Sequence, residues 1–270
     1  MLRDCTVNRI RIGGGAPVRL MGVINCSPES FYRGSYTPTG ELYNRALTML
    51  DLGADMIDIG ARSTAPGTLP LTVSEEAARM DAALAEFDGT GITLSVDTCH
   101  AEVLAVCLRH DIHAANDISG LADERYARAV ADSGLPVFAM ASLKEPGDAV
   151  GLAATLSALE MVTARCARYG IEEYVLDPAI GRWTPERTSE DDWELCRNFE
   201  AFSTFGRPVL AAVSRKTFIG DLLEREPEGR LAGTLAVTTA LAAKGAAVVR
   251  SHDVRETADL LRIHEKMRKI

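Results

Sequence analysis

The stretch PVLAAVSRKTFIG, residues 208–220, sets the interpretation of the whole chain. Its first six residues form an apolar run typical of a buried strand, and Ser214, Arg215 and Lys216 follow where that strand ends. In an α/β barrel, the active site is built from residues at the carboxyl ends of the strands. Taken alone, the stretch also fits a helix that begins with Ser214 as its N-cap. It predicts a functional site only if other strands end in the same way.

Short apolar runs recur along the chain, each followed by polar residues and then by a segment with apolar positions spaced i, i+3, i+4. The runs cover residues 20–24, 56–59, 93–96, 113–115, 137–141, 174–176, 209–213 and 247–249. We therefore predict the α/β class and a (β/α)8 TIM barrel, which repeats a strand and a helix eight times. A doubly wound sheet also alternates the two elements, but typically has fewer strands.

Residues 5–19 precede the first run and have a different pattern. Apolar and polar residues alternate there around Gly13, Gly14 and Gly15. Alternation about a glycine cluster is typical of two short strands joined by a turn. We predict an N-terminal β-hairpin that turns at the three glycines and covers the bottom of the barrel.

The composition indicates one globular domain over residues 1–270. The chain is 47% hydrophobic, and it has no apolar stretch near the roughly 18 residues of a membrane span. Its first residues do not resemble a signal peptide, so we expect a cytoplasmic protein without a membrane partner. The net charge of −9 argues against a nucleic acid partner. Six scattered cysteines without CxxC spacing fit reduced thiols better than disulfides or a zinc site.

Polar side chains stand at the ends of most predicted strands, with acids and amides on some and basic residues on others. They are Asn25, Asp97, Asn116, Asp117, Asp177, Lys216, Arg250 and His252. Because the strand ends meet at one mouth, we predict a site with an acidic and a cationic half. A carboxylate matches a planar ligand that shows adjacent N–H groups, such as a pterin, and the cations with Asn25 match a phosphate and its metal. Asp117 is interpreted instead as a helix N-cap.

Seven motifs in order make the chain resemble the dihydropteroate synthase family. They are MGVINCSPESF (21–31), DIGARSTAPG (58–67), VDT (96–98), ND (116–117), DPAIG (177–181), SRKTFIG (214–220) and RSHDV (250–254). The resemblance implies a transferase that condenses 6-hydroxymethyl-dihydropterin pyrophosphate with an arylamine and releases pyrophosphate. It also implies Mg²⁺ and a homodimer, for which the small-residue helix expected at residues 231–243 is a candidate interface.

The same resemblance implies a role for individual residues. The dihydropterin would be held by Asp97, Asn116, Met140, Asp177 and Lys216. The pyrophosphate would be bound by Asn25, Thr64, Arg250 and His252, with Asn25 also binding the metal, and the arylamine would be bordered by Phe31, Thr64, Pro66 and Ser214. The catalytic set would be Asp97, Lys216, Arg250 and His252. Fixed cations and a metal would stabilise the leaving pyrophosphate, and Asp97 a cationic pterin methylene.

The chain departs from the familiar bacterial pattern in its second loop. Ala65 stands where the family has an arginine, and either Arg62 or Arg33 would have to supply that charge. The residue before Met140 is not the usual histidine. These loops are more similar to archaeal-type members, some tied to tetrahydromethanopterin. That similarity implies a ribosyl-aminobenzene phosphate as an alternative to p-aminobenzoate.

Two other functions stay open at this point. Pterin-dependent methyltransferases share the barrel and the pterin-binding acids and amide, but they act on a corrinoid partner. They are not expected to carry Lys216 in this seventh loop or the RSHDV motif, so both features favour the synthase. A barrel that binds pterin without turnover is the third interpretation, and it rests on Ala65.

Overall fold

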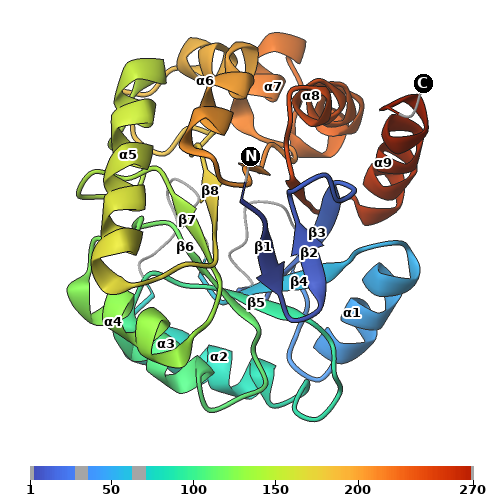
Figure 1. Ribbon diagram of the computed structural model, residues 1–270. Coiled ribbons are helices and arrows are strands. Elements are labelled where there is room, and N and C mark those ends of the chain that lie inside the picture. Colours follow the sequence, from blue (N-terminus) through green and yellow to red (C-terminus); the bar gives the residue numbers. More distant parts are fainter. Residues whose placement is uncertain (1–2, 28–35, 63–70, 269–270) are drawn as a thin grey trace.

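The computed structural model describes residues 3–27, 36–62 and 71–268, which form a ring of strands surrounded by helices (Figure 1). Parallel strands follow the order β8-β7-β6-β5-β4-β3-β10-β9 around this ring. They are β3 (Arg19–Asn25), β4 (Met56–Gly60), β5 (Leu94–Asp97), β6 (Ala114–Asp117), β7 (Val137–Met140), β8 (Tyr174–Asp177), β9 (Leu210–Ala211) and β10 (Val248–Ser251). A bridge between Leu176 and Val209 joins β8 to the β9 side and closes the barrel.

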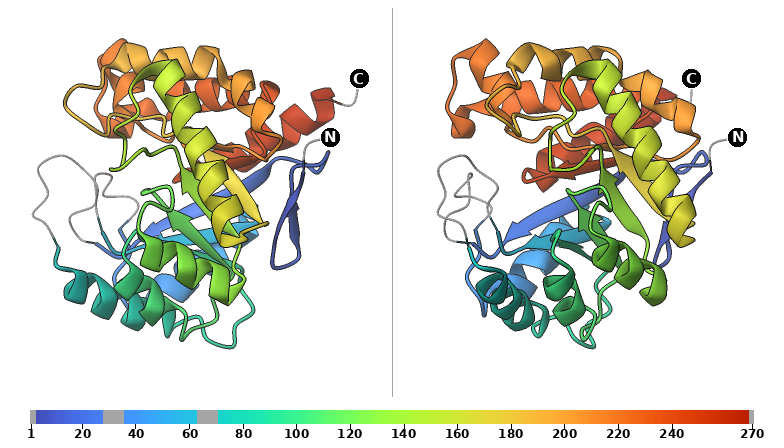
Figure 2. Two further views of the ribbon diagram at one scale, coloured as in Figure 1. Left: turned by 60° about the vertical axis from the view of Figure 1, so that its left-hand side comes forward. Right: turned by 90° about the vertical axis from the view of Figure 1, so that its left-hand side faces the viewer.

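Helices follow the strands and form the outer layer (Figure 2). They are α1 (Leu42–Asp51), α2 (Val73–Leu84), α3 (Ala101–Cys107), α4 (Glu124–Ser133), α5 (Gly151–Tyr169), α6 (Ser189–Arg197), α7 (Thr217–Leu223), α8 (Leu231–Ala243) and α9 (Val254–Arg268), with 3₁₀ turns η2 (Phe199–Phe205) and η3 (Pro227–Arg230). Every predicted apolar run overlaps one barrel strand. The predicted (β/α)8 barrel is therefore confirmed.

The barrel strands read as apolar runs because helices and core cover both of their faces. β4, β7 and β8 are buried along their whole length. A parallel strand that is buried on both faces loses the alternation seen in half-exposed strands. Polar residues therefore stand out where they occur, and most of them lie at the carboxyl ends that form the mouth of the barrel.

The N-terminal hairpin is confirmed, but its predicted turn is wrong. The hairpin pairs β1 (Cys5–Val7) with β2 (Ile10–Ile12), so the turn lies at Asn8 and Arg9 and the glycine cluster follows β2. Asn8 adopts a left-handed φ of 55°, which asparagine tolerates better than most residues. Its side-chain Nδ2 donates to Thr93 Oγ1 at 3.1 Å. This contact fastens the turn to the residue before β5.

The hairpin closes the lower end of the barrel, as predicted. Val7 and Ile12 are fully buried and pack in one apolar cluster with residues from inside the barrel, including Met21, Phe138 and Val248. Burying these side chains stabilises the fold by about 25 cal/mol per Å² of apolar surface. The hairpin and this cluster therefore fill the end of the barrel opposite the mouth.

Two helices that border the mouth begin with a capping box. Thr72 accepts from the backbone N–H of Glu75 at the start of α2, and Thr188 accepts from that of Asp191 at the start of α6. In each case the acid side chain in turn accepts a hydrogen bond from the threonine backbone N–H. Each box satisfies backbone donors that the first turn of a helix leaves unpaired. The capping boxes therefore fix the residues at which α2 and α6 begin.

All six cysteines are free thiols in the structure. Burial raises the pKa of Cys26 to about 12, and that of Cys99, near the mouth, also to about 12. Neither sulfur is a thiolate at neutral pH. Among the described helices, none is long and apolar enough to cross a membrane.

The loop after β6 depends on one glycine, which predicts a large difference between two alanine variants. Gly120 has φ +61°, and a Cβ there would lie 2.4 Å from the Met140 carbonyl oxygen. Gly134 has φ +68°, but nothing lies within 4 Å of its Cβ position. We expect Gly134→Ala to lower the free energy of unfolding by about 1 kcal/mol and Gly120→Ala by at least about 3 kcal/mol, since only the latter adds a clash. Urea denaturation measures both, and equal losses would contradict the geometry.

Candidate functional site

The candidate site is centred on Arg250, near the end of β10. Its Nε donates to Asp58 Oδ2 at 2.7 Å and its Nη2 to Asp97 Oδ2 at 2.6 Å. Asn116 Nδ2 donates to the same Asp58 oxygen at 3.0 Å. One guanidinium thus holds two carboxylates from neighbouring strands, and the amide of a third strand joins them. The register supports this grouping, because Asp97 pairs with Asn116 across β5 and β6.

The two carboxylates differ in how far a ligand can reach them. Asp58 is fully buried, whereas the side chain of Asp97 is 26% exposed. Burial, together with Asp58 and Glu76, raises the pKa of Asp97 above its ordinary value, and Arg250 acts against this. Burial lowers the pKa of Arg250, but Asp58 and Asp97 outweigh it and raise that pKa overall. Asp97 is therefore the accessible acceptor, and Asp58 fixes Arg250 from below.

Asp58 was missed as a site residue by sequence reasoning. It lies inside β4, two residues before the strand ends, where the surrounding residues are apolar. A lone acid in a buried strand needs a partner, because an unpaired buried charge is costly. That signal was present in the sequence, but the partner, Arg250, is 192 positions away.

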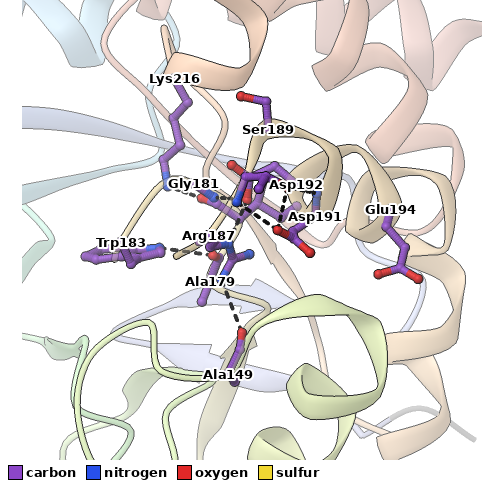
Figure 3. Close-up of polar contacts among 12 residues, drawn as sticks. Ala149, Ala179, Gly181, Trp183, Arg187, Ser189, Asp191, Asp192, Glu194 and Lys216 are labelled. Atoms are coloured by element: carbon purple, nitrogen blue, oxygen red, sulfur yellow. Dashed lines mark hydrogen bonds and ion pairs between the residues drawn. The ribbon is translucent and has the colours of Figure 1, made fainter. Parts of the chain in front are cut away.

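Asp177 and Lys216 form the second part of the site. Asp177 ends β8, beside Met140 in the register of β7, and its Oδ1 accepts from the Ala179 N–H at 2.8 Å. Burial raises the pKa of Asp177, and Lys216 opposes this effect. Burial lowers the pKa of Lys216 to about 8, although the negative charge of Asp177 acts to raise it. Lys216 Nζ donates to the Ile180 carbonyl, and the lysine lies beside Gly181 (Figure 3).

The Ser-Arg-Lys stretch divides between different tasks. Ser214 Oγ accepts from the His252 backbone N–H at 3.2 Å and lies 3.0 Å from His252 Nδ1. Arg215 turns away from the site and forms a two-point ion pair with Asp253, at 2.6 and 2.9 Å. The backbone turns here, with φ +56° at Arg215. Of these two cations, Lys216 is the one that reaches the loop after β8.

His252 is an uncharged imidazole at neutral pH. Burial lowers the pKa of His252 to about 3, and the positive charges of Arg250, Arg215 and Lys216 add to the effect. A neutral imidazole donates from one ring nitrogen and accepts at the other. His252 can therefore offer a ligand oxygen a hydrogen bond, but it adds no positive charge to the mouth.

Two of the predicted strand-end residues bind nearby backbone. Asn25 Oδ1 accepts from the Ser27 N–H at 2.8 Å. The N-cap interpretation of Asp117 is wrong, because Asp123 caps α4. The fully buried Asp117 instead accepts from the backbone N–H groups of Ser119 and Leu121, at 2.7 and 2.6 Å. It shapes the loop after β6.

Part of the predicted site lies outside the described residues, namely Phe31, Arg33, Thr64, Ala65 and Pro66. Of the two predicted substitutes for the missing arginine, only Arg62 is described. Arg62 Nη2 donates to the Leu71 carbonyl at 2.6 Å, and Nε lies 3.4 Å from Glu76 Oε2.

Glu76 is a second residue that sequence reasoning missed. It belongs to α2, is 1% exposed, and accepts from Thr98 Oγ1 at 2.7 Å, next to Asp97. His100 Nδ1 also lies 2.9 Å from its carboxylate. In the described part of the chain, no three His, Cys, Asp or Glu side chains are grouped to hold a metal.

Comparison with known proteins identifies the relationship. The model of a pterin binding enzyme family matches residues 21–252. A dihydropteroate synthase of Escherichia coli is 33% identical over 261 residues, covering 91% of this chain and 90% of that protein. A dihydropteroate synthase of Coxiella burnetii, solved in complex with pteroic acid, has a TM-score of 0.84 at 27% identity and covers 98% of both chains.

A further structure extends this comparison to the other substrate. The dihydropteroate synthase of Xanthomonas albilineans, solved with 4-aminobenzoic acid, has a TM-score of 0.84 at 31% identity and covers 99% of this chain and 98% of that one. The barrel of this chain agrees with these similarities. The chain belongs to the pterin-binding enzyme family, as a transferase of the dihydropteroate synthase type.

Proposed function

We propose that this protein condenses 6-hydroxymethyl-dihydropterin pyrophosphate with p-aminobenzoate in folate biosynthesis and releases pyrophosphate. The observation that carries the proposal is the cluster of Asp97, Asn116 and Arg250 beside Asp177 and Lys216. The cluster joins hydrogen-bond acceptors to cations at one mouth, and the substrate has N–H groups at one end and phosphates at the other.

The acceptor half is matched to the pterin. Asp97 and Asp177 offer carboxylate oxygens, and the amide nitrogen of Asn116 is engaged by Asp58, so its oxygen is turned toward other donors. Lys216 donates where the ring presents an acceptor. Met140 is 1% exposed and lies beside Asp177 in the register, where its side chain can pack on the ring. Charge-assisted hydrogen bonds to a planar edge give orientation as well as affinity.

The leaving-group half needs a divalent cation by the balance of charge. Among the described residues at the mouth, Asp58, Asp97 and Asp177 lie near Arg250 and Lys216, while Arg215 is paired with Asp253 and His252 is neutral. When the three carboxylates are ionised, these groups have no surplus positive charge for a pyrophosphate. We propose that Asn25 would supply an oxygen ligand to Mg²⁺, which would provide positive charge that stabilises a pyrophosphate.

The chain's own residues then orient the reaction and stabilise its charges. The arylamine nitrogen attacks the methylene carbon of the pterin, the C–O bond to pyrophosphate breaks, and the proton lost by the amine passes to water or to the departing pyrophosphate. Asp97 stabilises positive charge that develops on the pterin, and Arg250 and His252 donate to the phosphate oxygens. No covalent nucleophile is required, which agrees with the raised pKa values of Cys26 and Cys99.

The choice of arylamine is supported by the relatives. The similar proteins reported above are bacterial dihydropteroate synthases, and one was solved with 4-aminobenzoic acid. We propose that Ser214, with Phe31, Thr64 and Pro66, borders this substrate. A ribosyl-aminobenzene phosphate stays the alternative. Lys216 and the RSHDV motif favour the synthase over a corrinoid-dependent methyltransferase.

Assembly and location remain proposals. We propose a homodimer through α8, whose outer face carries small exposed side chains, Ala232, Ala236 and Ala240. The single domain over residues 1–270, the cytoplasmic location and the lack of nucleic acid and membrane partners stay predictions from the composition.

The pterin half is tested by two matched carboxylate variants. Asp177→Asn replaces an acceptor by a donor facing a ligand N–H, and we expect it to weaken dihydropterin binding by roughly 2 to 4 kcal/mol. Asp117→Asn makes the same change in a side chain that binds only loop backbone in the hydrogen bonds given above. It should lower thermal stability and leave the affinity of the folded protein near that of the parent. Calorimetric titration measures both, and equal affinities for Asp177→Asn and the parent would remove Asp177 from the site.

The leaving-group half is tested with His252→Ala. Because His252 is assigned to the pyrophosphate, the variant should weaken binding of the dihydropterin pyrophosphate by at least about tenfold in the presence of Mg²⁺, the order of one lost hydrogen bond to a charged group. Binding of the dihydropterin alcohol, which has no phosphate, should change little. Equal weakening of both ligands in calorimetry would rule out the division into two halves.

The arylamine is tested with Ala65→Arg, which restores the family arginine. If p-aminobenzoate is the substrate, the added cation should raise its turnover, since it can pair with the carboxylate. If a ribosyl phosphate occupies the space next to residue 65, the larger arginine side chain should lower turnover with that substrate. Steady-state rates with both amines on parent and variant decide between them. Absence of turnover with both in the parent would favour the methyltransferase or a barrel that only binds pterin.

A further inference from the structure

An ion pair buried from solvent lies behind the pterin half of the site. Arg187 Nε is 2.9 Å from Asp192 Oδ1, and both side chains are 0% exposed. Removing two charges from water carries a desolvation penalty that can exceed their attraction, so such a pair is weak evidence for a purely stabilising role. The contacts of the pair point to a second role.

The pair connects three segments of the chain (Figure 3). Asp192, in the first turns of α6, accepts from the Gly181 N–H at 2.7 Å with the same Oδ1 that receives Arg187. Arg187 Nη1 donates to the Ala149 carbonyl at 3.3 Å, just before α5. Asp192 therefore holds the loop after β8, and Arg187 ties that hold to the loop after β7.

The loop held by Asp192 lies directly under Lys216. Gly181 has φ +136°, and a Cβ there would lie 2.8 Å from both Cδ and Nζ of Lys216. The lysine crosses the glycine at contact distance and donates to the carbonyl of Ile180. Trp183 completes the surroundings, with its ring centroid 5.3 Å from Lys216 Nζ and its Nε1 donating to the Ala179 carbonyl. The position of the ammonium group thus depends on the shape of this loop.

The pair also acts on Lys216 through its charges. Besides burial, Asp177 from β8 and Asp192 from α6 favour the charged lysine, whereas Arg250 from β10 and Arg187 from the β8–α6 loop disfavour it. His252 also faces this group, but it is uncharged. The two members of the ion pair therefore have opposite effects on the pKa of Lys216.

We propose that Arg187 and Asp192 are positioning residues for Lys216: Asp192 holds the Gly181 backbone against the lysine, and Arg187 holds Asp192 in place. The inference deepens the proposed function, and it rests on that function only for the identity of the ligand that Lys216 meets. Sequence motifs alone do not reveal it, because Arg187 and Asp192 belong to none of the seven family motifs.

The experiment measures the titration of Lys216 directly, without using activity. The chain has few lysines, so isotope-labelled lysine side chains give a simple NMR spectrum; they are Lys144, Lys216, Lys244, Lys266 and Lys269. Lys216→Arg identifies the Lys216 signal by its loss. The parent should titrate with a pKa of about 8. The variants are Asp192→Asn, Arg187→Gln and the double variant with both changes.

The two single variants should shift the pKa of Lys216 in opposite directions. Asp192→Asn removes a negative charge and leaves Arg187 uncompensated, so the pKa should fall. Arg187→Gln removes a positive charge, so the pKa should rise, each by on the order of 0.5 to 1 unit. The double variant removes both effects and should return the pKa toward that of the parent. Each single variant predicts a direction of its own, so either one that folds is enough for the test.

A merely structural pair predicts another pattern. If the pair only stabilised the loop, each single variant would loosen it and move the pKa of Lys216 in the same direction, toward the ordinary value of an exposed lysine. That result would overturn the proposal. So would an unchanged pKa in all three variants. Asp191→Asn is the matched control, because it removes the adjacent carboxylate of α6, which binds Thr188 rather than Gly181.

Titration of the parent with the dihydropterin alcohol separates this inference from the proposed function. If the ligand does not bind, the proposed function fails while the NMR shifts still test the ion pair. If it binds and no variant shifts Lys216, the ion-pair proposal fails and the function stands.

Discussion

The site depends on one guanidinium that is shared by two carboxylates. Without Arg250, the buried Asp58 and the nearby Asp97 would repel each other with no positive charge between them. With it, both are held at fixed positions as hydrogen-bond acceptors. Asp58 Oδ1 has no hydrogen-bond partner among the described residues. The cluster therefore contains more acceptors than donors, which suits a ligand that brings N–H groups of its own.

Adjacent residues of like charge have separate tasks because the backbone reverses between them. Arg215 takes a left-handed conformation, so its side chain meets Asp253 and the carbonyls of Pro227 and Glu228, whereas Lys216 enters the mouth. The same turn lets Ser214 bind His252. The motif combines a structural tie and a proposed ligand contact within three residues.

Much of the fold could be predicted from the sequence, since strands buried on both faces leave apolar runs that end in polar residues. The same ends marked Asp97, Asn116, Asp177 and Arg250, because polar groups at a barrel mouth need partners or ligands. The role of each was less predictable. Asp117 is of a residue type that often caps helices, but it binds loop backbone instead.

What could not be predicted depends on contacts between distant residues. The hairpin turns at Asn8, whose side-chain amide reaches Thr93, and not at the local glycines. Asp58 and Asp192 acquire meaning only through Arg250 and Arg187. The sequence pattern of one segment does not show which residue of opposite charge lies beside that segment in the fold.

The closure of the barrel has a consequence for its motions. β9 has only two residues, and it meets β8 through the Leu176 and Val209 bridge rather than a full ladder. Lys216, which follows β9, reaches across to the Ile180 carbonyl after β8 and reinforces this seam from above. Few backbone bonds make a seam the place where amide hydrogens exchange first through local opening. A ligand that contacts both Asp177 and Lys216 fastens the two edges together, so occupancy of the site and integrity of the ring are thermodynamically coupled.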